Sequence, residues 1–472
     1  MFDIKVIETS SLGDRSYLAT DGTVAVVVDP QRDVDRFLAV AGRLGVPITH
    51  VAETHLHNDY VSGGLELARL TGATYLVVAA EDVAFERVGV SDGDVIEVSP
   101  RMRLRVVATP GHTFHHLSYV LEDPQGPVGV FTGGSLLFGT TGRTDLLGSE
   151  HTVELARAQY ASVRTLGELL PDGTQVWPTH GFGSFCAVGQ VSGDASTIGQ
   201  QRAVNPVFRL ARDEFVKQTL AGMGDYPAYY VHMGVINAAG PAPVDLRPAR
   251  RIDKDELAGR LRRGEWVVDL RARKAYFASH LAGTISLGLD GPMATWVGWL
   301  IDWGAPITLV GETGEQIARA QRELVRIGID RVAGAAVGSP ERMAADPTQV
   351  ESVPAASFRD LAAVLSGAPP ADLPPADVVL DVRFDIEWNT SHISCAVHIP
   401  LPELSKRVAD VPSGTVWVHC ASGYRATAGA SLLARAGRSV VVINDVYDNA
   451  ARAGVPLTIN ANDPGIQLVP DC

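Results

Sequence analysis

One cysteine near the carboxy terminus lies in a setting that favours nucleophilic chemistry. The segment His419-Cys-Ala-Ser-Gly-Tyr-Arg425 connects an apolar β-type run to a helix-type run. A loop in that position directs successive backbone N–H groups inward, and the helix start adds partial positive charge. We therefore expect Cys420 to be a thiolate and the nucleophile, with an ordinary buried cysteine as the alternative. Arg425 can hold an oxyanion with its planar cation. The residues expected to surround the substrate are Ala421, Ser422, Gly423 and Tyr424.

Histidines gather after β-type runs in the amino-terminal half. His55 and His57 are two residues apart on a loop-type segment, with Asp59 beside them. His112 and His180 each follow another β-type run. A metal site on a sheet edge requires histidines on loops after separate strands. The sequence therefore predicts that these five residues are candidate ligands of one metal ion, whereas a single such histidine would be a surface or hydrogen-bonded residue.

Two breaks rich in proline and glycine, at residues 240–248 and 338–354, divide the chain. The expected domains are residues 1–240, 250–345 and 355–472, close to the three domains that 472 residues predict. In the last two, strands alternate with loops and helices, which predicts parallel sheets with helices on their faces. The predicted fold class is therefore a multidomain α/β protein.

The second and third segments repeat each other. Each contains an apolar run that ends in Asp-x-Arg, followed nine residues later by a histidine. In the first copy, Gly311 stands at the nucleophile position and Gln316 at the arginine position. Because this copy has neither the thiol nor the cation, we expect it to be a packing or docking domain.

Loop length and neighbouring motifs indicate a family for the last segment. Four residues separate Cys420 from Arg425, whereas cysteine phosphatases have five and a wider cradle. The loop resembles that of the rhodanese sulfurtransferases, whose cysteine carries a persulfide sulfur. Asp381-Val-Arg383, Glu387-Trp388 and His392-Ile393 look like further stretches of that family. The resemblance implies two rhodanese-like domains, the first degenerate.

The histidine pattern resembles the metallo-β-lactamase superfamily, an αββα sandwich, over residues 1–240. Val24-Ala-Val-Val-Val-Asp-Pro30 looks like the family's early strand, and Gly142-Arg-Thr-Asp145 and Asn205-Pro206 look like persulfide dioxygenase stretches. Hydroxyacylglutathione hydrolases are also similar. The whole layout resembles bacterial persulfide dioxygenase–rhodanese fusions, and this implies that Arg143 contacts the substrate.

Two positions depart from that family pattern. Tyr60 stands where the HxHxDH motif ends in histidine, and Gly134 stands where a metal-binding carboxylate follows Phe-Thr-Gly. Persulfide dioxygenases hold Fe(II) through two histidines, matched here by His55 and His112, and through that carboxylate. The resemblance implies one metal ion, Fe(II) or alternatively Zn, in a weakened site.

Three arrangements of this site stay open on sequence alone. His57 or Asp59 completes it, a water completes it, or the metal is absent; in the last case Gly134→Asp is a route to a site that was missing. Two neighbouring histidines, His115 and His116, lack a comparable frame and are expected to be structural.

Composition restricts the partners and the compartment. With 40 Lys+Arg against 54 Asp+Glu, the net charge is −14, which disfavours nucleic acid and anionic membranes as partners. Four cysteines (Cys186, Cys395, Cys420 and Cys472) are too few for a disulfide framework and suit a reducing compartment. Cys395 replaces a usual glycine, and we expect a small buried replacement in preference to a second reactive thiol. No secretory or membrane-spanning pattern is present, so a cytoplasmic protein is expected.

These observations predict a sulfur-handling enzyme. Cys420 would take sulfur from thiosulfate or a low-molecular-weight persulfide and pass it to a thiol, and a competent metal domain would oxidise the resulting persulfide to sulfite. One alternative is a metal-dependent thioester hydrolase fused to a rhodanese; another is a vestigial metal domain that delivers substrate to Cys420. The sequence leaves open whether the chain forms a homo-oligomer.

Overall fold

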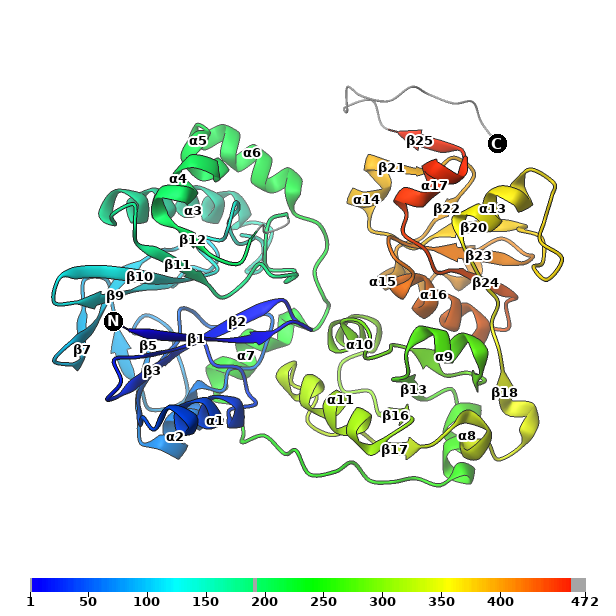
Figure 1. Ribbon diagram of the computed structural model, residues 1–472, viewed down its shortest axis with the longest axis horizontal. Coiled ribbons are helices and arrows are strands. Elements are labelled where there is room, and N and C mark those ends of the chain that lie inside the picture. Colours follow the sequence, from blue (N-terminus) through cyan, green and yellow to red (C-terminus); the bar gives the residue numbers. More distant parts are fainter. Residues whose placement is uncertain (1, 190–192, 460–472) are drawn as a thin grey trace. The chain divides into compact units, whose positions relative to one another are not determined.

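The computed structural model describes residues 2–189 and 193–459, which form two compact units (Figure 1). The amino-terminal unit extends to Asp245 and also includes Arg322–Asp330; the carboxy-terminal unit contains Leu246–Gln321 and the described residues from Arg331 onward. Among the described residues, no helix is both long enough and apolar enough to cross a lipid bilayer.

The amino-terminal unit contains two six-stranded sheets. The first has the order β1 (Asp3–Thr9), β2 (Asp14–Thr20), β3 (Ala25–Val28), β4 (Ile48–Ala52), β5 (Thr74–Val78) and β6 (Val88–Val90). The second has the order β12 (Ser196–Thr197), β11 (Gln175–Pro178), β10 (Gly126–Gly133), β9 (Leu117–Asp123), β8 (Met102–Ala108) and β7 (Val95–Ser99). Both sheets are mixed, with parallel pairs at β3–β4 and β10–β11.

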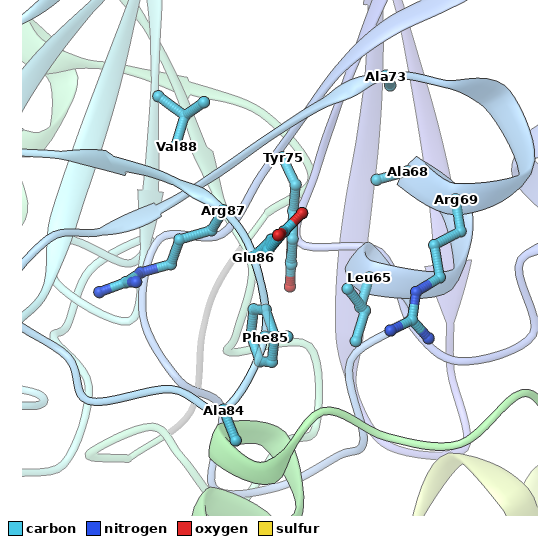
Figure 2. Close-up of a pocket in the computed structure, with 10 residues that line it drawn as sticks. All are labelled: Leu65, Ala68, Arg69, Ala73, Tyr75, Ala84, Phe85, Glu86, Arg87 and Val88. Atoms are coloured by element: carbon cyan, nitrogen blue, oxygen red, sulfur yellow. The ribbon is translucent and has the colours of Figure 1, made fainter.

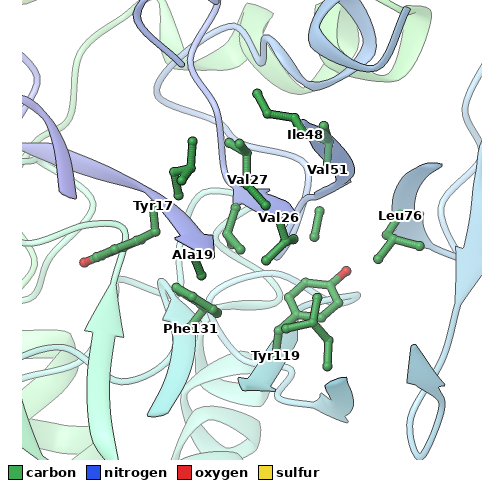
Figure 3. Close-up of a cluster of buried hydrophobic side chains, with 14 of the residues drawn as sticks. Tyr17, Ala19, Val26, Val27, Ile48, Val51, Leu76, Tyr119 and Phe131 are labelled. Carbon is green, nitrogen blue, oxygen red and sulfur yellow. The ribbon is translucent and has the colours of Figure 1, made fainter. Parts of the chain in front are cut away.

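Central strands that are apolar on both faces explain why the two sheets stack on each other and are covered by helices on the outside. Successive side chains of a strand point to opposite faces. Tyr119 and Phe131 therefore face the first sheet, where they join the cross-strand pair Ala19 and Val26 in one buried cluster (Figure 3). Val130, next to Phe131, belongs to a second cluster, which includes residues of the helices over the other face.

Helices cover both outer faces. They are α1 (Asp35–Leu44) and α2 (Gly64–Thr71) on one side, and α3 (Thr152–Leu169), α4 (Ile198–Val204), α5 (Pro206–Arg209) and α6 (Arg212–Gly222) on the other (Figure 1). A further helix, α7, spans Tyr230–Ala239. The predicted αββα sandwich is thereby confirmed.

The carboxy-terminal unit contains two parallel sheets. One has the order β15 (Ile285–Ser286), β13 (Trp266–Asp269), β16 (Ile307–Gly311) and β17 (Gly334–Val337). The other has the order β19 (Ala355–Ala356), β24 (Val440–Ile443), β23 (Val416–His419), β20 (Val378–Asp381) and β22 (Val397–His398). The main helices are α8 (Lys254–Arg262), α9 (Arg273–Ala278), α10 (Met293–Leu300), α11 (Gly314–Arg326), α13 (Phe358–Leu365), α14 (Asp385–Thr390), α16 (Tyr424–Arg435) and α17 (Asp448–Ala453). Parallel pairing throughout both sheets confirms the predicted class of these domains.

Strand register supports the duplication of the two sheets. Asp269 lies opposite Val310, and Asp381 lies opposite His419. The next residues along those strands are Gly311 and Cys420. The two Asp-x-Arg motifs also form the same buried ion pair, with Nη2 to Oδ2 at 2.6 Å in both copies. The copies therefore share a frame and differ at the loop that follows it.

One segment groups differently from the expected domain of residues 250–345. The end of α11 belongs to the amino-terminal unit, since Nη2 of Arg326 lies 2.7 Å from Oδ2 of buried Asp33, and Arg322 pairs with Asp35 at 2.7 Å. The backbone N–H of Val61 donates to the Arg326 carbonyl at 2.7 Å. Charged side chains on one helix turn thus join two parts of the chain that are far apart in sequence.

Candidate active-site loop and candidate metal centre

The Cys420 loop connects β23 to α16. Cys420 is buried, and its Sγ accepts a hydrogen bond from the Gly423 N–H at 3.1 Å. Gly423 has φ +93°, a conformation that a residue with Cβ adopts only with strain, so the glycine permits the tight turn. The loop therefore directs at least one backbone donor to the sulfur, as the sequence predicts.

Arg425 is held at the base of this loop by an acidic partner. Its Nη1 and Nη2 donate to the two carboxylate oxygens of Glu387 at 2.5 and 2.7 Å. Burial opposes ionisation of Glu387, yet the hydrogen bonds from Arg425 hold the pKa of that carboxyl below its usual range. A bidentate pair of this kind fixes the orientation of the guanidinium plane. Glu387 therefore fixes the position of the Arg425 side chain next to the loop.

The first copy contributes contacts to the Cys420 loop. Nη1 of Arg273 donates to the Ser422 carbonyl at 2.8 Å, and the Tyr424 hydroxyl donates to the Gly288 carbonyl at 3.0 Å. Gly291 lies against the Tyr424 ring, where any Cβ would overlap it. These contacts give the first copy a packing role at the loop. The sequence does not identify Arg273, because it is 149 positions from its partner and has no local motif.

In the first copy, the side chain of Gln316 folds back onto the corresponding loop. Oε1 of Gln316 accepts a hydrogen bond from the Glu312 N–H at 2.7 Å. A Cβ added to Gly311 would come within 2.9 Å of that same oxygen. The glutamine side chain therefore lies against Gly311, at the position where the second copy has Cys420.

The five predicted ligands form two overlapping buried groups in the amino-terminal unit, one of His55, His112 and His180 and the other of His57, Asp59 and His180. His55 follows β4, His112 follows β8 and His180 follows β11, and all three are buried. One nitrogen of each lies within 4.8 Å of the others, and the Nε2 atoms of His55 and His180 are 3.4 Å apart. The structure thus brings together histidines from three separate loops.

His57 belongs to a buried ion cluster beside them. Its Nε2 lies 3.3 Å from both Oδ1 of Asp29 and Oε2 of Glu53, and 2.9 Å from the Tyr60 hydroxyl. Burial alone would lower the pKa of His57, but the two carboxylates raise it to about 9. His57 is therefore held in place by the two carboxylates. Tyr60, which replaces the family's histidine, stacks on this ring at 4.2 Å.

Asp29 positions two of the histidine-bearing loops, a role that sequence reasoning missed. It has φ +51°, the only positive φ of a non-glycine residue among the described parts of the chain. Its carboxylate accepts from the Thr54 N–H at 2.7 Å and from the Thr54 hydroxyl at 2.8 Å, and it also accepts from Thr179. Thr54 and Thr179 directly precede His55 and His180. The Asp-Pro end of the early strand was the available signal.

Comparison with known proteins assigns the amino-terminal part of the chain. A family model described as the Metallo-beta-lactamase superfamily matches residues 14–180. Over 210 residues, 44% of this chain and 74% of the relative, the chain is 30% identical to human "Persulfide dioxygenase ETHE1, mitochondrial". The chain belongs to the metallo-β-lactamase superfamily. A model of the Rhodanese-like domain matches residues 368–451, which include the Cys420 loop.

Two further relatives extend this picture of a metallo-β-lactamase protein. A hydroxyacylglutathione hydrolase from Polaromonas sp. is 32% identical over 160 residues, 34% of this chain and 57% of that protein. A crystal structure of a metallo-beta-lactamase from Staphylococcus aureus superimposes with a TM-score of 0.64 at 28% identity, covering 71% of this chain and 99% of the other. That coverage exceeds the amino-terminal domain alone.

Within the metallo-β-lactamase domain, Arg143 is committed to internal partners. It donates to both carboxylate oxygens of Asp145 and to the carbonyls of Phe185 and Gly224, and it is 3% exposed. Its own carbonyl oxygen lies 2.7 Å from Nδ1 of His112. Its predicted contact with substrate stays a prediction, and the geometry shows instead that it holds His112.

The structure separates the described cysteines by environment. Cys186 is buried in the metallo-β-lactamase domain, and burial together with Asp59 raises the pKa of its thiol well above its usual value. Cys395 is exposed, so the expectation that it is a buried replacement is wrong: it lies in the turn between β21 (Ser391–Ile393) and β22. Cys472 lies outside the described residues.

A pocket of about 560 Å³ opens beside the ion cluster of the metallo-β-lactamase domain (Figure 2). Tyr75 and Phe85 line it with ring centroids 5.7 Å apart, together with Arg69 and Arg87. The Tyr75 hydroxyl donates to Oε1 of Glu53 at 3.2 Å. The pocket wall is thus one hydrogen bond away from a carboxylate of the cluster.

Proposed function

We propose that this chain is an enzyme of sulfur metabolism whose rhodanese domain transfers sulfane sulfur through a Cys420 persulfide. The thiolate attacks the outer sulfur of thiosulfate, forming one S–S bond and breaking another, and sulfite leaves with the electron pair. A low-molecular-weight thiolate then attacks the outer sulfur of the Cys420 persulfide. This releases a new persulfide and restores the Cys420 thiolate. An incoming persulfide serves as donor in the same way, with its thiol as the leaving group.

The main support is the loop itself. Gly423 N–H lies 3.1 Å from Sγ, and Arg425 is oriented at the helix start by Glu387. Donors fixed before the reaction stabilise an anionic sulfur without reorganisation. The match to the rhodanese family over residues 368–451 supports the same reaction class.

For the metallo-β-lactamase domain we propose oxidation of the thiol persulfide, with O2 and water, to thiol and sulfite. The similarity to a persulfide dioxygenase supports this assignment. Bound Fe(II) would supply activation of O2 and an open position for the substrate sulfur. The chain's own contribution is a buried set of imidazoles, held by Thr54, by the Arg143 carbonyl and by Asp14. The two domains would then act on a shared persulfide.

Cys420→Ser tests the first activity. The variant should lose thiosulfate:thiol sulfur transfer, measured as sulfite and persulfide release, while its thermal unfolding stays that of the parent chain. Retained transfer by a folded Cys420→Ser would refute the assignment.

Oxygen uptake tests the second activity. Anaerobically prepared, Fe(II)-loaded protein should consume O2 and release sulfite when given glutathione persulfide. Thioester hydrolysis without O2 uptake would instead support the hydroxyacylglutathione hydrolase alternative, to which a similarity also exists. If the protein binds no metal and shows neither O2 uptake nor thioester hydrolysis, the amino-terminal domain would be a non-catalytic scaffold.

A further inference from the structure

We propose that His180 replaces the missing carboxylate, so that His55, His112 and His180 form a three-imidazole site for one divalent transition-metal ion. This rests on the proposed function only in assigning a metal to the amino-terminal domain. Imidazole nitrogen suits iron, zinc and copper. The three histidines come from separate loops and are all fully or almost fully buried.

The hydrogen bonds of His112 and His55 place the ring hydrogen on Nδ1, so that Nε2 of each neutral ring carries a lone pair. Nδ1 of His112 lies 2.7 Å from the Arg143 carbonyl, which can only accept, so Nδ1 carries the hydrogen. The Thr54 hydroxyl donates to Asp29, and its oxygen therefore accepts from Nδ1 of His55 at 2.9 Å. Nε2 of His112 is buried without a hydrogen-bond partner. An unpaired buried acceptor is costly, which points to a ligand at that atom.

His180 is held in the same manner by two carboxylates. Its Nδ1 lies 3.0 Å from Oδ1 of Asp14 and 3.1 Å from Oδ2 of Asp59. Its Nε2 is therefore directed to Nε2 of His55, at 3.4 Å. Two nitrogens bound to one metal at about 2.0–2.1 Å with a tetrahedral angle are about 3.3–3.4 Å apart. This pair is already at the spacing that a shared metal requires.

The space next to Gly134 explains why a carboxylate is not the third ligand. A Cβ added there would lie 2.6 Å from Nε2 of His112 and would overlap the rest of the ring. The imidazole thus fills the volume of the missing side chain. The negative charge of the missing carboxylate is carried instead by Asp14 and Asp59, which contact Nδ1 of His180. Carboxylates that bond to a ligand histidine orient it and raise its basicity.

Two neighbouring histidines lie outside this group of three. Nε2 of His57 is paired with Asp29 and Glu53, its Nδ1 is buried without a hydrogen-bond partner, and the residue groups instead with Asp59 and His180. His116 stacks on His55 at 4.9 Å, but its Nδ1 lies 2.8 Å from the Thr109 hydroxyl and its Nε2 accepts from the Gly134 N–H at 3.1 Å. Because both ring nitrogens of His116 are used, it is a matched control: a buried histidine of the same cluster that should not bind metal.

The test is anaerobic titration of the full metal-free chain with Co(II), followed by visible absorption and equilibrium dialysis. The parent chain and His116→Gln should bind one equivalent, and His180→Gln and His112→Gln should lose stoichiometric binding. Retained binding by His112→Gln would place the metal with His57 and Asp59 and overturn the proposal, as would retained binding by His180→Gln or equal loss in His116→Gln.

Two measurements keep this test decisive. X-ray absorption of the Co(II)-loaded parent chain should show three imidazoles; two would overturn the proposal even if a variant failed to fold. Thiosulfate:thiol transfer, which depends on Cys420, should be unchanged in His180→Gln. A failure of sulfur transfer in the parent chain would therefore refute the proposed function while leaving the metal assignment standing.

Discussion

Gly423→Ala tests whether the turn at Gly423 supports the reactive sulfur. Alanine at φ +93° would be strained by about 1–2 kcal/mol. Its Cβ would also overlap Oδ1 of Asn444 and come within 3.0 Å of Nη1 of Arg273. Relief requires the loop to shift, which withdraws the Gly423 N–H from Sγ. A hydrogen bond to a charged group contributes about 1.5–3 kcal/mol, so kcat/KM should fall roughly 10- to 150-fold.

Gly437→Ala is the matched control. Gly437 follows the end of the same helix with φ +78°, and no atom lies within 4 Å of a Cβ added there. Alanine at position 437 would therefore have the same kind of backbone strain as alanine at position 423, but its Cβ would not overlap any neighbouring atom. Thermal unfolding and thiosulfate:thiol kinetics are measured on both variants. Both variants should unfold at a lower temperature than the parent chain, but only Gly423→Ala should lose sulfur-transfer activity. Activity of Gly423→Ala within about threefold of the parent, or an equal loss in Gly437→Ala, would show that the turn does not support catalysis.

Three further predictions concern a loop contact, a buried histidine and a buried ion pair. Arg273→Ala removes a charged donor from the partly exposed Ser422 carbonyl, so kcat/KM for sulfur transfer should fall about fivefold (~1 kcal/mol), while Lys274→Ala in the same helix should leave it unchanged. Burial lowers the pKa of His419 to about 4, so as the pH falls below 6.5 the histidine becomes protonated in the unfolded state before it does in the folded state. The free energy of unfolding of the carboxy-terminal unit should therefore fall by ~2 kcal/mol between pH 7 and pH 5. In urea unfolding, the midpoint of His419→Phe should fall less over the same pH range. Asp33→Ala leaves Arg326 buried without its carboxylate and should destabilise the amino-terminal unit by about 3–5 kcal/mol in urea unfolding; a change below about 1 kcal/mol would contradict the ion-pair account.

Local sequence was sufficient where the chemistry depends on adjacent residues. The strand, the loop and the helix around Cys420 are contiguous, so their order alone predicts a cysteine facing backbone donors. Duplication was equally visible, because the Asp-x-Arg pairs of both copies form within three residues. The exposure of Cys395 was not predictable, since a turn between two short strands has no apolar period to show which way a side chain points.

The histidine motif alone determined that a cluster forms after several strands, but the tertiary structure decided what each histidine does. His57 and His55 are two residues apart in one loop. His57 faces the carboxylates of Asp29 and Glu53, whereas His55 faces His180 from a strand 125 positions away. Gly134 looks like the loss of a ligand in sequence; in space it makes room for the His112 ring. The role of a buried imidazole depends on the partner of each ring nitrogen, and those partners come from distant parts of the chain that only the folded arrangement brings together.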